Sequence, residues 1–90
     1  MPESEDAPEL DYPVAYVFRV VLPRAPDVRA RVHRLVESEL GPLPEEATTV
    51  RESRAGRYVA VHVSCVLQSE EERRAVYQRL RELPQVLLTL

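Results

Sequence analysis

The chain has 90 residues, enough for one domain and too few for two. Hydrophobic residues make up 44% and charged residues 30% of it, which excludes a disordered chain, and no apolar run approaches the roughly 20 residues that span a bilayer. Residues 1–11 hold five of the 15 acidic side chains. The remainder has ten acids and twelve arginines, a net charge of +2, which argues against nucleic acid as a partner.

The acidic residues 1–11 contain two prolines, and we expect them to form a disordered arm before a folded domain over 12–90. The opening MPESEDAPEL lacks the basic-then-apolar order of a signal peptide, so we expect a cytoplasmic protein with no membrane partner. The stretch YPVAYVFRVVL, residues 12–22, is rich in β-branched and aromatic residues and predicts the first strand.

A helix is predicted next, over 28–40. Asp27 is a typical N-cap, the apolar residues after it recur at i, i+4, i+7 and i+8, and Gly41 ends the pattern. The proline-rich stretch 42–47 predicts a loop, and 48–53 predicts a short second strand.

The longest alternating segment, RYVAVHVSCVL at 57–67, predicts the third strand. Ser69 and Glu72 have the spacing of a capping box, which marks the start of a second helix that Pro84 ends. QVLLTL, residues 85–90, predicts the last strand. The order βαββαβ predicts an α+β, ferredoxin-like sandwich, in which a four-stranded antiparallel sheet of order 4-1-3-2 carries two helices on one face.

Three groups of residues follow one another in a fixed order over 12–90. They are Tyr12, Pro13, Val14, Phe18 and Arg19 in the first strand, Ser53, Gly56, Arg57, Tyr58 and Val59 at the turn into the third, and Val76, Tyr77, Pro84, Val86 and Leu90 in the last third. This order resembles the YbeD-like family of small bacterial proteins of unknown function. The resemblance implies a ferredoxin-like fold, a similarity to ACT-type regulatory domains that bind amino acids, and no known enzymatic activity.

The segment after the first strand departs from that family. Members carry a glycine there, and ACT-type domains use it to let a ligand approach the backbone, whereas this chain reads Leu22, Pro23, Arg24. The departure argues against an ACT-like amino-acid pocket.

Arg19 decides which side of the first strand faces the helices, because an unpaired buried charge costs several kcal/mol. We therefore expect Tyr16, Phe18, Val20 and Leu22 inside and Arg19 on the uncovered side of the sheet, the open face. On the last strand Val86, Leu88 and Leu90 should point inward. The open face is then mostly apolar and is a candidate protein-contact face, with Val17, Arg19, Val21, Tyr58, Ala60, His62 and Leu87 as its principal members and Ala15, Ser64, Val66 and Thr89 beside them.

Other sites have weaker sequence support. Arg54 and Arg57 flank Gly56 in a turn that could bind an anion, although a hairpin turn with solvated arginines is the simpler interpretation. His33 is expected on a solvated helix face and Cys65 as a small buried hydrophobe, so we predict no metal or other cofactor.

No nucleophile, base and acid are spaced for catalysis, and we expect no enzyme. The third strand lies where an RNA-recognition fold keeps its stacking rings, but its open side offers only Tyr58 and His62. The function predicted is a non-catalytic regulatory or adaptor domain that binds a protein partner, in the simplest case a second copy as a homodimer. The alternative is an amino-acid sensor with its ligand near the connector 22–27.

Overall fold

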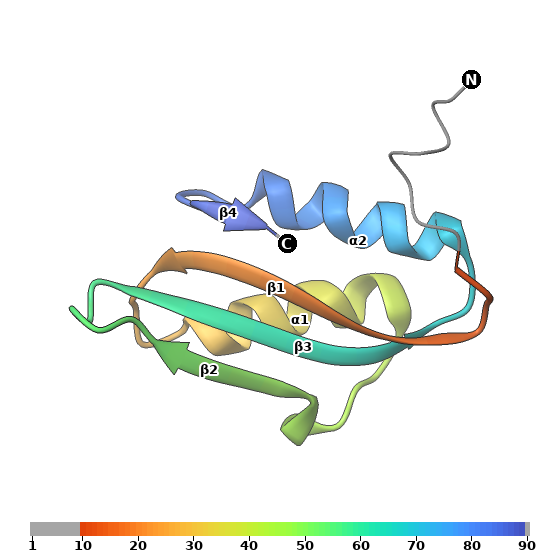
Figure 1. Cartoon of the computed structure of the whole chain (residues 1–90), viewed down its shortest axis with the longest axis horizontal. Helices are drawn as coiled ribbons and strands as arrows, with labels where there is room; N and C mark the ends of the chain where they lie inside the picture. The colour runs from red at the N-terminus through yellow and green to blue at the C-terminus, as the bar shows by residue number, and fades with distance from the viewer. Residues whose placement is uncertain (1–9, 90) are drawn as a thin grey trace.

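The computed structural model describes residues 10–89, which form an antiparallel sheet and two helices; in Figure 1 one helix lies behind the central strands and the other lies beside them. The sheet order is β2-β3-β1-β4. The α+β class, an antiparallel sheet with two helices, is confirmed. None of the helices in the described residues is long and apolar enough to cross a membrane. The elements are β1 (Val14–Pro23), α1 (Val28–Leu40), a 3-10 turn η2 (Glu45–Ala47), β2 (Thr48–Glu52), β3 (Tyr58–Leu67), α2 (Glu70–Glu82) and β4 (Leu88–Thr89).

β1 and β3 form the centre of the sheet and pair along ten residues each. Arg19 lies opposite His62, and both side chains lie on the open face, while Phe18 and Val63 lie opposite each other in the core. The predicted orientation of the first strand is therefore confirmed. The core consists of residues no more than 4% exposed: Phe18, Val20, Leu22, Val28, Val32, Val36, Val59, Val61, Val63, Leu67, Val76 and Leu80.

The two helices begin in different ways. At α2 the serine half of the predicted capping box forms, because the Ser69 hydroxyl accepts from the Glu72 amide at 3.2 Å. The Glu72 carboxylate accepts from the Gln68 amide at 2.7 Å instead of closing the box on Ser69. At α1 the predicted side-chain cap is wrong. Asp27 makes no capping hydrogen bond, and its carboxylate lies 3.5 Å from the Arg31 guanidinium.

The last strand is shorter than predicted. β4 covers two residues of the predicted 85–90, because Gln85 has a φ of 67°, which extended backbone does not adopt. Val86 packs against the core as predicted, whereas Leu90 lies outside the described residues.

One more hydrogen bond joins the chain to β1 just before β4. The Leu87 amide donates to the Val21 carbonyl at 2.8 Å, and Val21 is also the ladder partner of Leu88. Thr89 pairs with buried Val20, so Thr89 lies on the helix side of the sheet, and its predicted place on the open face is wrong. The predicted direction of the Leu88 side chain lies outside what the structure describes.

His33 is not on a solvated helix face, and that prediction is wrong. Its side chain is 6% exposed and lies between α1 and the start of β2. Its Nδ1 atom is 2.6 Å from the Thr48 hydroxyl, and its Nε2 atom is 3.5 Å from a Glu37 carboxylate oxygen. The imidazole is thus a buried polar group that is hydrogen-bonded through Nδ1, as burial requires.

Candidate protein-contact face

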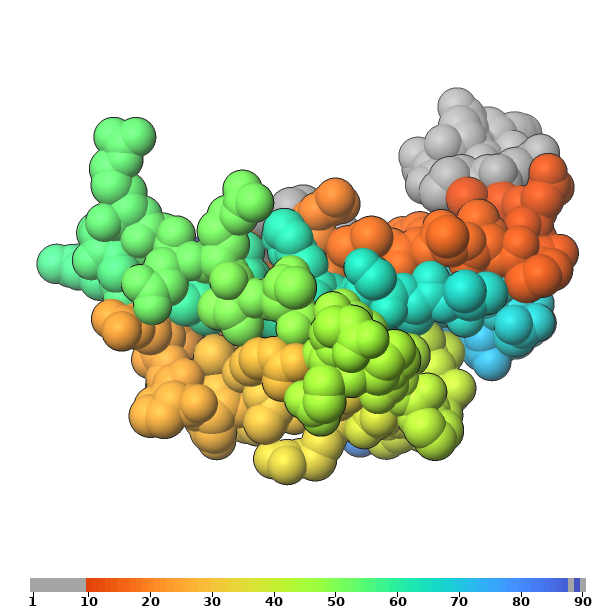
Figure 2. Space-filling view, turned by 90° about the horizontal axis from the view of Figure 1, so that it is seen from below, coloured from red at the N-terminus to blue at the C-terminus, as the bar shows by residue number. Residues whose placement is uncertain are grey.

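The open face is built by the alternation of β1 and β3, whose paired residues point to the same side of the sheet. Val17 lies opposite Ser64, Arg19 opposite His62, and Val21 opposite Ala60. Figure 2 shows the strands as the upper layer and α1 as the lower layer, so the helix lies on the other side of the sheet. The predicted contact residues on β1 and β3 are therefore brought together on one surface.

The apolar members of this face differ in exposure. Tyr58 is 38% exposed, Val66 55% and Leu87 61%, which makes these three the most accessible apolar side chains near the face. Leu87 lies just before β4, bound through its amide to Val21, at the far edge of the sheet from β2. Large apolar side chains at this exposure are typical of contact surfaces when they are contiguous.

Two members of the open face were missed by the sequence analysis. Thr49 pairs with His62 and Arg51 pairs with Ala60, so the alternation of β2 places both on the open face. The sequence could have indicated this placement, because the charged Arg51 side chain favours the solvent-facing side of its strand, as Arg19 does in β1.

The charges on the open face are all basic. Arg19 and Arg51 are exposed, and within residues 10–89 neither forms a salt bridge. His62 lies between them in the pairing across the three strands. The described residues of this face include no carboxylate, so an acidic partner surface would complement it.

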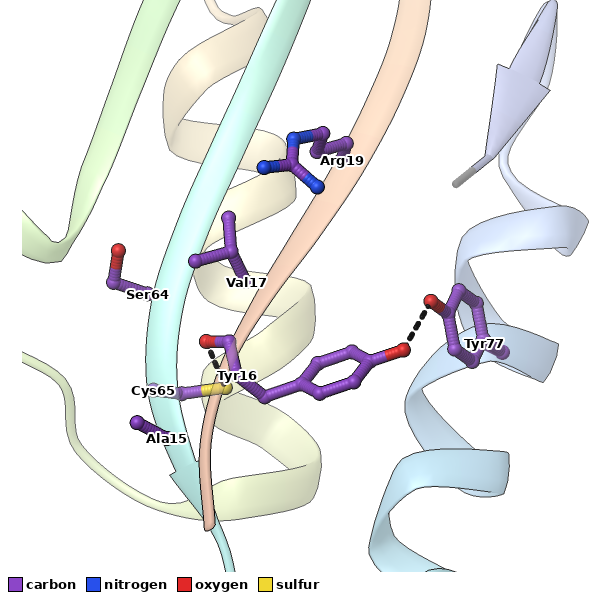
Figure 3. A pocket seen from close by; sticks show the side chains of 7 residues that line it. All are labelled: Ala15, Tyr16, Val17, Arg19, Ser64, Cys65 and Tyr77. Carbon is purple, nitrogen blue, oxygen red and sulfur yellow. Dashed lines mark hydrogen bonds between the residues drawn. The ribbon is translucent and has the colours of Figure 1, made fainter. Parts of the chain in front are cut away.

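A hollow of about 490 Å³ opens beside β1 at one margin of the open face. The Tyr16 ring extends from β1 to α2, where its hydroxyl is 2.7 Å from that of Tyr77 (Figure 3). The two rings meet edge to face with centroids 6.3 Å apart, and the Arg73 guanidinium lies 5.7 Å from the centre of the Tyr77 ring. The hollow is lined by Ala15, Tyr16, Val17, Arg19, Ser64, Cys65 and Tyr77.

Cys65 lies half-buried in the wall of this hollow and donates weakly to the Tyr16 carbonyl at 3.7 Å. Burial, and then the negative charge of Glu72, raise the pKa of the thiol to about 11. Because the thiolate is the reactive form, the native thiol should be a poor nucleophile at neutral pH.

We expect iodoacetamide to alkylate Cys65 about a hundred times more slowly in the native protein than in urea, because the raised pKa lowers the thiolate fraction. The label is followed by mass spectrometry over time, and the native rate should rise as the pH approaches 11. Equal rates for native and unfolded protein would show that burial does not protect the sulfur.

Glu70 lies at the start of α2, where its carboxylate is hydrogen-bonded to three neighbouring side chains. Its carboxylate accepts from the Tyr12 hydroxyl at 2.6 Å, from Arg73 at 2.8 Å and from Arg74 at 3.1 Å. Hydrogen bonds from Arg73 and then from Tyr12 lower the pKa of Glu70 to about 2. The cluster attaches the segment before β1 to the N-terminus of α2.

The predicted anion turn forms the tip of the β2–β3 hairpin. Gly56 has a φ of 78°, and its amide donates to the Ser53 carbonyl at 3.0 Å. Arg54 and Arg57 are exposed on either side of it, and the Arg57 carbonyl accepts from the Arg24 amide at 2.9 Å. The Gly56 amide that would contact an anion is therefore used inside the turn, which favours the hairpin interpretation.

The fold and the open face define a small α+β domain whose sheet has one uncovered side. The chain belongs to the family described as "Protein of unknown function (DUF493)", whose model matches residues 7–90. It is 26% identical over 87 residues to a UPF0250 protein of Hahella chejuensis, with 97% of this chain and 96% of that protein covered. The resemblance to small YbeD-like proteins of unknown function is thus confirmed.

Two solved structures of one protein show the same fold. A solution structure of HP0495 from Helicobacter pylori matches with a TM-score of 0.71 at 22% identity and covers 100% of this chain and 94% of that one. A second solution structure of HP0495 matches with a TM-score of 0.55 and full coverage of both chains.

Proposed function

We propose that this protein is a non-catalytic regulatory or adaptor domain that acts through protein–protein contact at its open face. One observation carries the proposal: helices cover one side of the sheet, and the other side presents exposed apolar side chains, Tyr58 and Val66 among them. The use of Glu70 and Glu72 in binding Tyr12 and capping α2 supports a non-catalytic role.

The architecture in this proposal is ferredoxin-like, which the strand order β2-β3-β1-β4 and the element order βαββαβ support. The simplest partner is a second copy of the chain, which would cover the open face in a homodimer. The cytoplasmic location expected from the sequence belongs to the same proposal.

The test replaces two exposed apolar side chains, Tyr58 on the open face and Leu87 beside it at the β4 edge, as Tyr58→Asp together with Leu87→Asp. Because both are already exposed in the monomer, the change should leave folding nearly unaffected and should lower the mass of any oligomer measured by sedimentation equilibrium.

Val50→Asp is the matched control. Val50 is 39% exposed, close to the 38% of Tyr58, but its partner in the register is buried Val61, on the helix side of the sheet. The proposal predicts that Val50→Asp leaves the mass unchanged. An oligomer that only Val50→Asp disrupts would move the contact to the β2 edge, and a protein that is monomeric at every concentration would exclude the homodimer.

A further inference from the structure

We propose that the edge of β1 beside the hollow lined by Tyr16 and Tyr77, which we call the tyrosine hollow, accepts an extended, acidic peptide segment of a partner. This segment adds to the sheet as a further strand. The inference rests on the proposed function, since it specifies the chemistry of the protein partner. The contact inferred here differs in location from the contact in the proposed function, because it is made by backbone groups at an edge and not by the side chains of the open face.

The edge exists because β4 is short. β1 runs for ten residues, but β4 pairs only with Val20 and Val21, near one end of it. Along Val14–Phe18, no described residue pairs with β1 on the β4 side. We call this stretch the uncovered edge. An unpaired edge of this length is a template for strand addition.

The direction of the backbone groups follows from two contacts. The Val21 carbonyl accepts from the Leu87 amide, so the backbone groups of Val21 point toward β4. Alternation along a regular strand gives Val17 and Ala15 the same direction. The Tyr16 carbonyl contacts Cys65 of β3, as the opposite direction of its neighbours requires. The amides and carbonyls of Ala15 and Val17 therefore face the uncovered edge at the spacing that a strand partner needs.

Space for a strand lies beside this edge. The hollow of about 490 Å³ is bounded by Val17 and Arg19 of β1 and by Tyr77 of α2. In Figure 3 the Tyr16 ring crosses from β1 toward α2 and meets Tyr77, and β4 lies farther along the same side of β1. A strand added here would have the two tyrosine rings on its helix side and the open face on its other side.

The charges near the hollow define the partner. The Arg19 side chain is exposed on the open face and lines the hollow, and the lining includes no carboxylate. Arg73 on the other side is already paired with Glu70 at 2.8 Å. A strand placed here would therefore need an acidic side chain facing Arg19, and apolar side chains at the alternate positions that meet the tyrosine rings.

The test selects short random peptides displayed on phage against the immobilised full chain, and then measures synthetic copies of the selected peptides by fluorescence anisotropy. The expected sequences carry Asp or Glu at a position that alternates with apolar residues. Val17→Pro removes one of the amides that face the uncovered edge and leaves every donor to β3 in place, and should weaken binding at least about tenfold, as should Arg19→Glu.

Arg51→Glu is the matched control, since Arg51 is exposed on the same face but belongs to β2, on the opposite side of β3. It should leave binding unchanged. If Val17→Pro does not fold by circular dichroism, methylating alternate amides of the peptide removes the same hydrogen bonds from the other side. Selection of no binding peptide, or binding that neither Val17→Pro nor amide methylation weakens, would overturn the strand-addition model.

The same assay separates this inference from the proposed function. The protein with Tyr58→Asp and Leu87→Asp should still bind the selected peptides, because neither side chain lines the hollow. Peptide binding at the edge without any effect of these changes on oligomer mass would support the edge and reject the homodimer. A lower oligomer mass without any peptide binding would support the homodimer and reject strand addition at the edge.

Discussion

Phe18→Ala should be the most destabilising single change in the protein, at about 3–5 kcal/mol of the free energy of unfolding. The Phe18 side chain is 1% exposed, and its ring centroid lies 4.9 Å from that of Tyr16 and 5.0 Å from that of Tyr77. Its removal would leave a cavity beneath both tyrosines. A domain of this size has a small stability margin, so the variant should be largely unfolded at temperatures that the parent survives. Urea denaturation followed by circular dichroism measures the difference.

Val66→Ala provides the comparison for that experiment. Val66 is 55% exposed on the other side of the same sheet, and its truncation should change the free energy of unfolding by less than about 0.5 kcal/mol. A loss below about 1 kcal/mol for Phe18→Ala would mean that the three aromatic rings do not pack as described.

Thr48→Val should cost about 1–3 kcal/mol, although it preserves the shape of the side chain. The change removes the hydroxyl that is 2.6 Å from Nδ1 of His33, and both residues are buried. The imidazole nitrogen would then have no partner in a site that water does not reach. The measurement is the urea midpoint at constant pH, with the slope of the transition checked for change.

Thr49→Val is the matched control for this change, because Thr49 is the neighbouring residue with the same side chain and is exposed on the open face. It should alter stability by less than about 0.5 kcal/mol. Equal effects at the two positions would show that the loss comes from β2 itself and not from the buried hydrogen bond.

The main elements could be predicted from the sequence because their signals are local. The alternation in β1 and β3 and the N-cap at Ser69 depend on neighbours within a few residues. Arg19 then indicated which side of the sheet faces solvent. These predictions located most of the contact face.

The features that could not be predicted from the sequence depend on contacts between residues far apart in the chain. His33 is buried because Thr48 of β2 lies beside α1, and the tyrosine hollow joins residues 61 positions apart, Tyr16 and Tyr77. β4 was predicted too long because the apolar run QVLLTL gives no sign of the positive φ at Gln85. These features follow from packing, which periodicity alone does not report.

The pairing of β1 with β3 has a consequence for how the chain is made. Val14 lies opposite Leu67, so the first strand of the sheet cannot reach its partner until more than half of the remaining polypeptide has left the ribosome. During that interval its apolar side has no sheet to join, whereas β2 and β3 can close as a hairpin at once. Synthesis rate and chaperone supply should therefore affect the yield of this protein more than those of an all-helical domain of equal length.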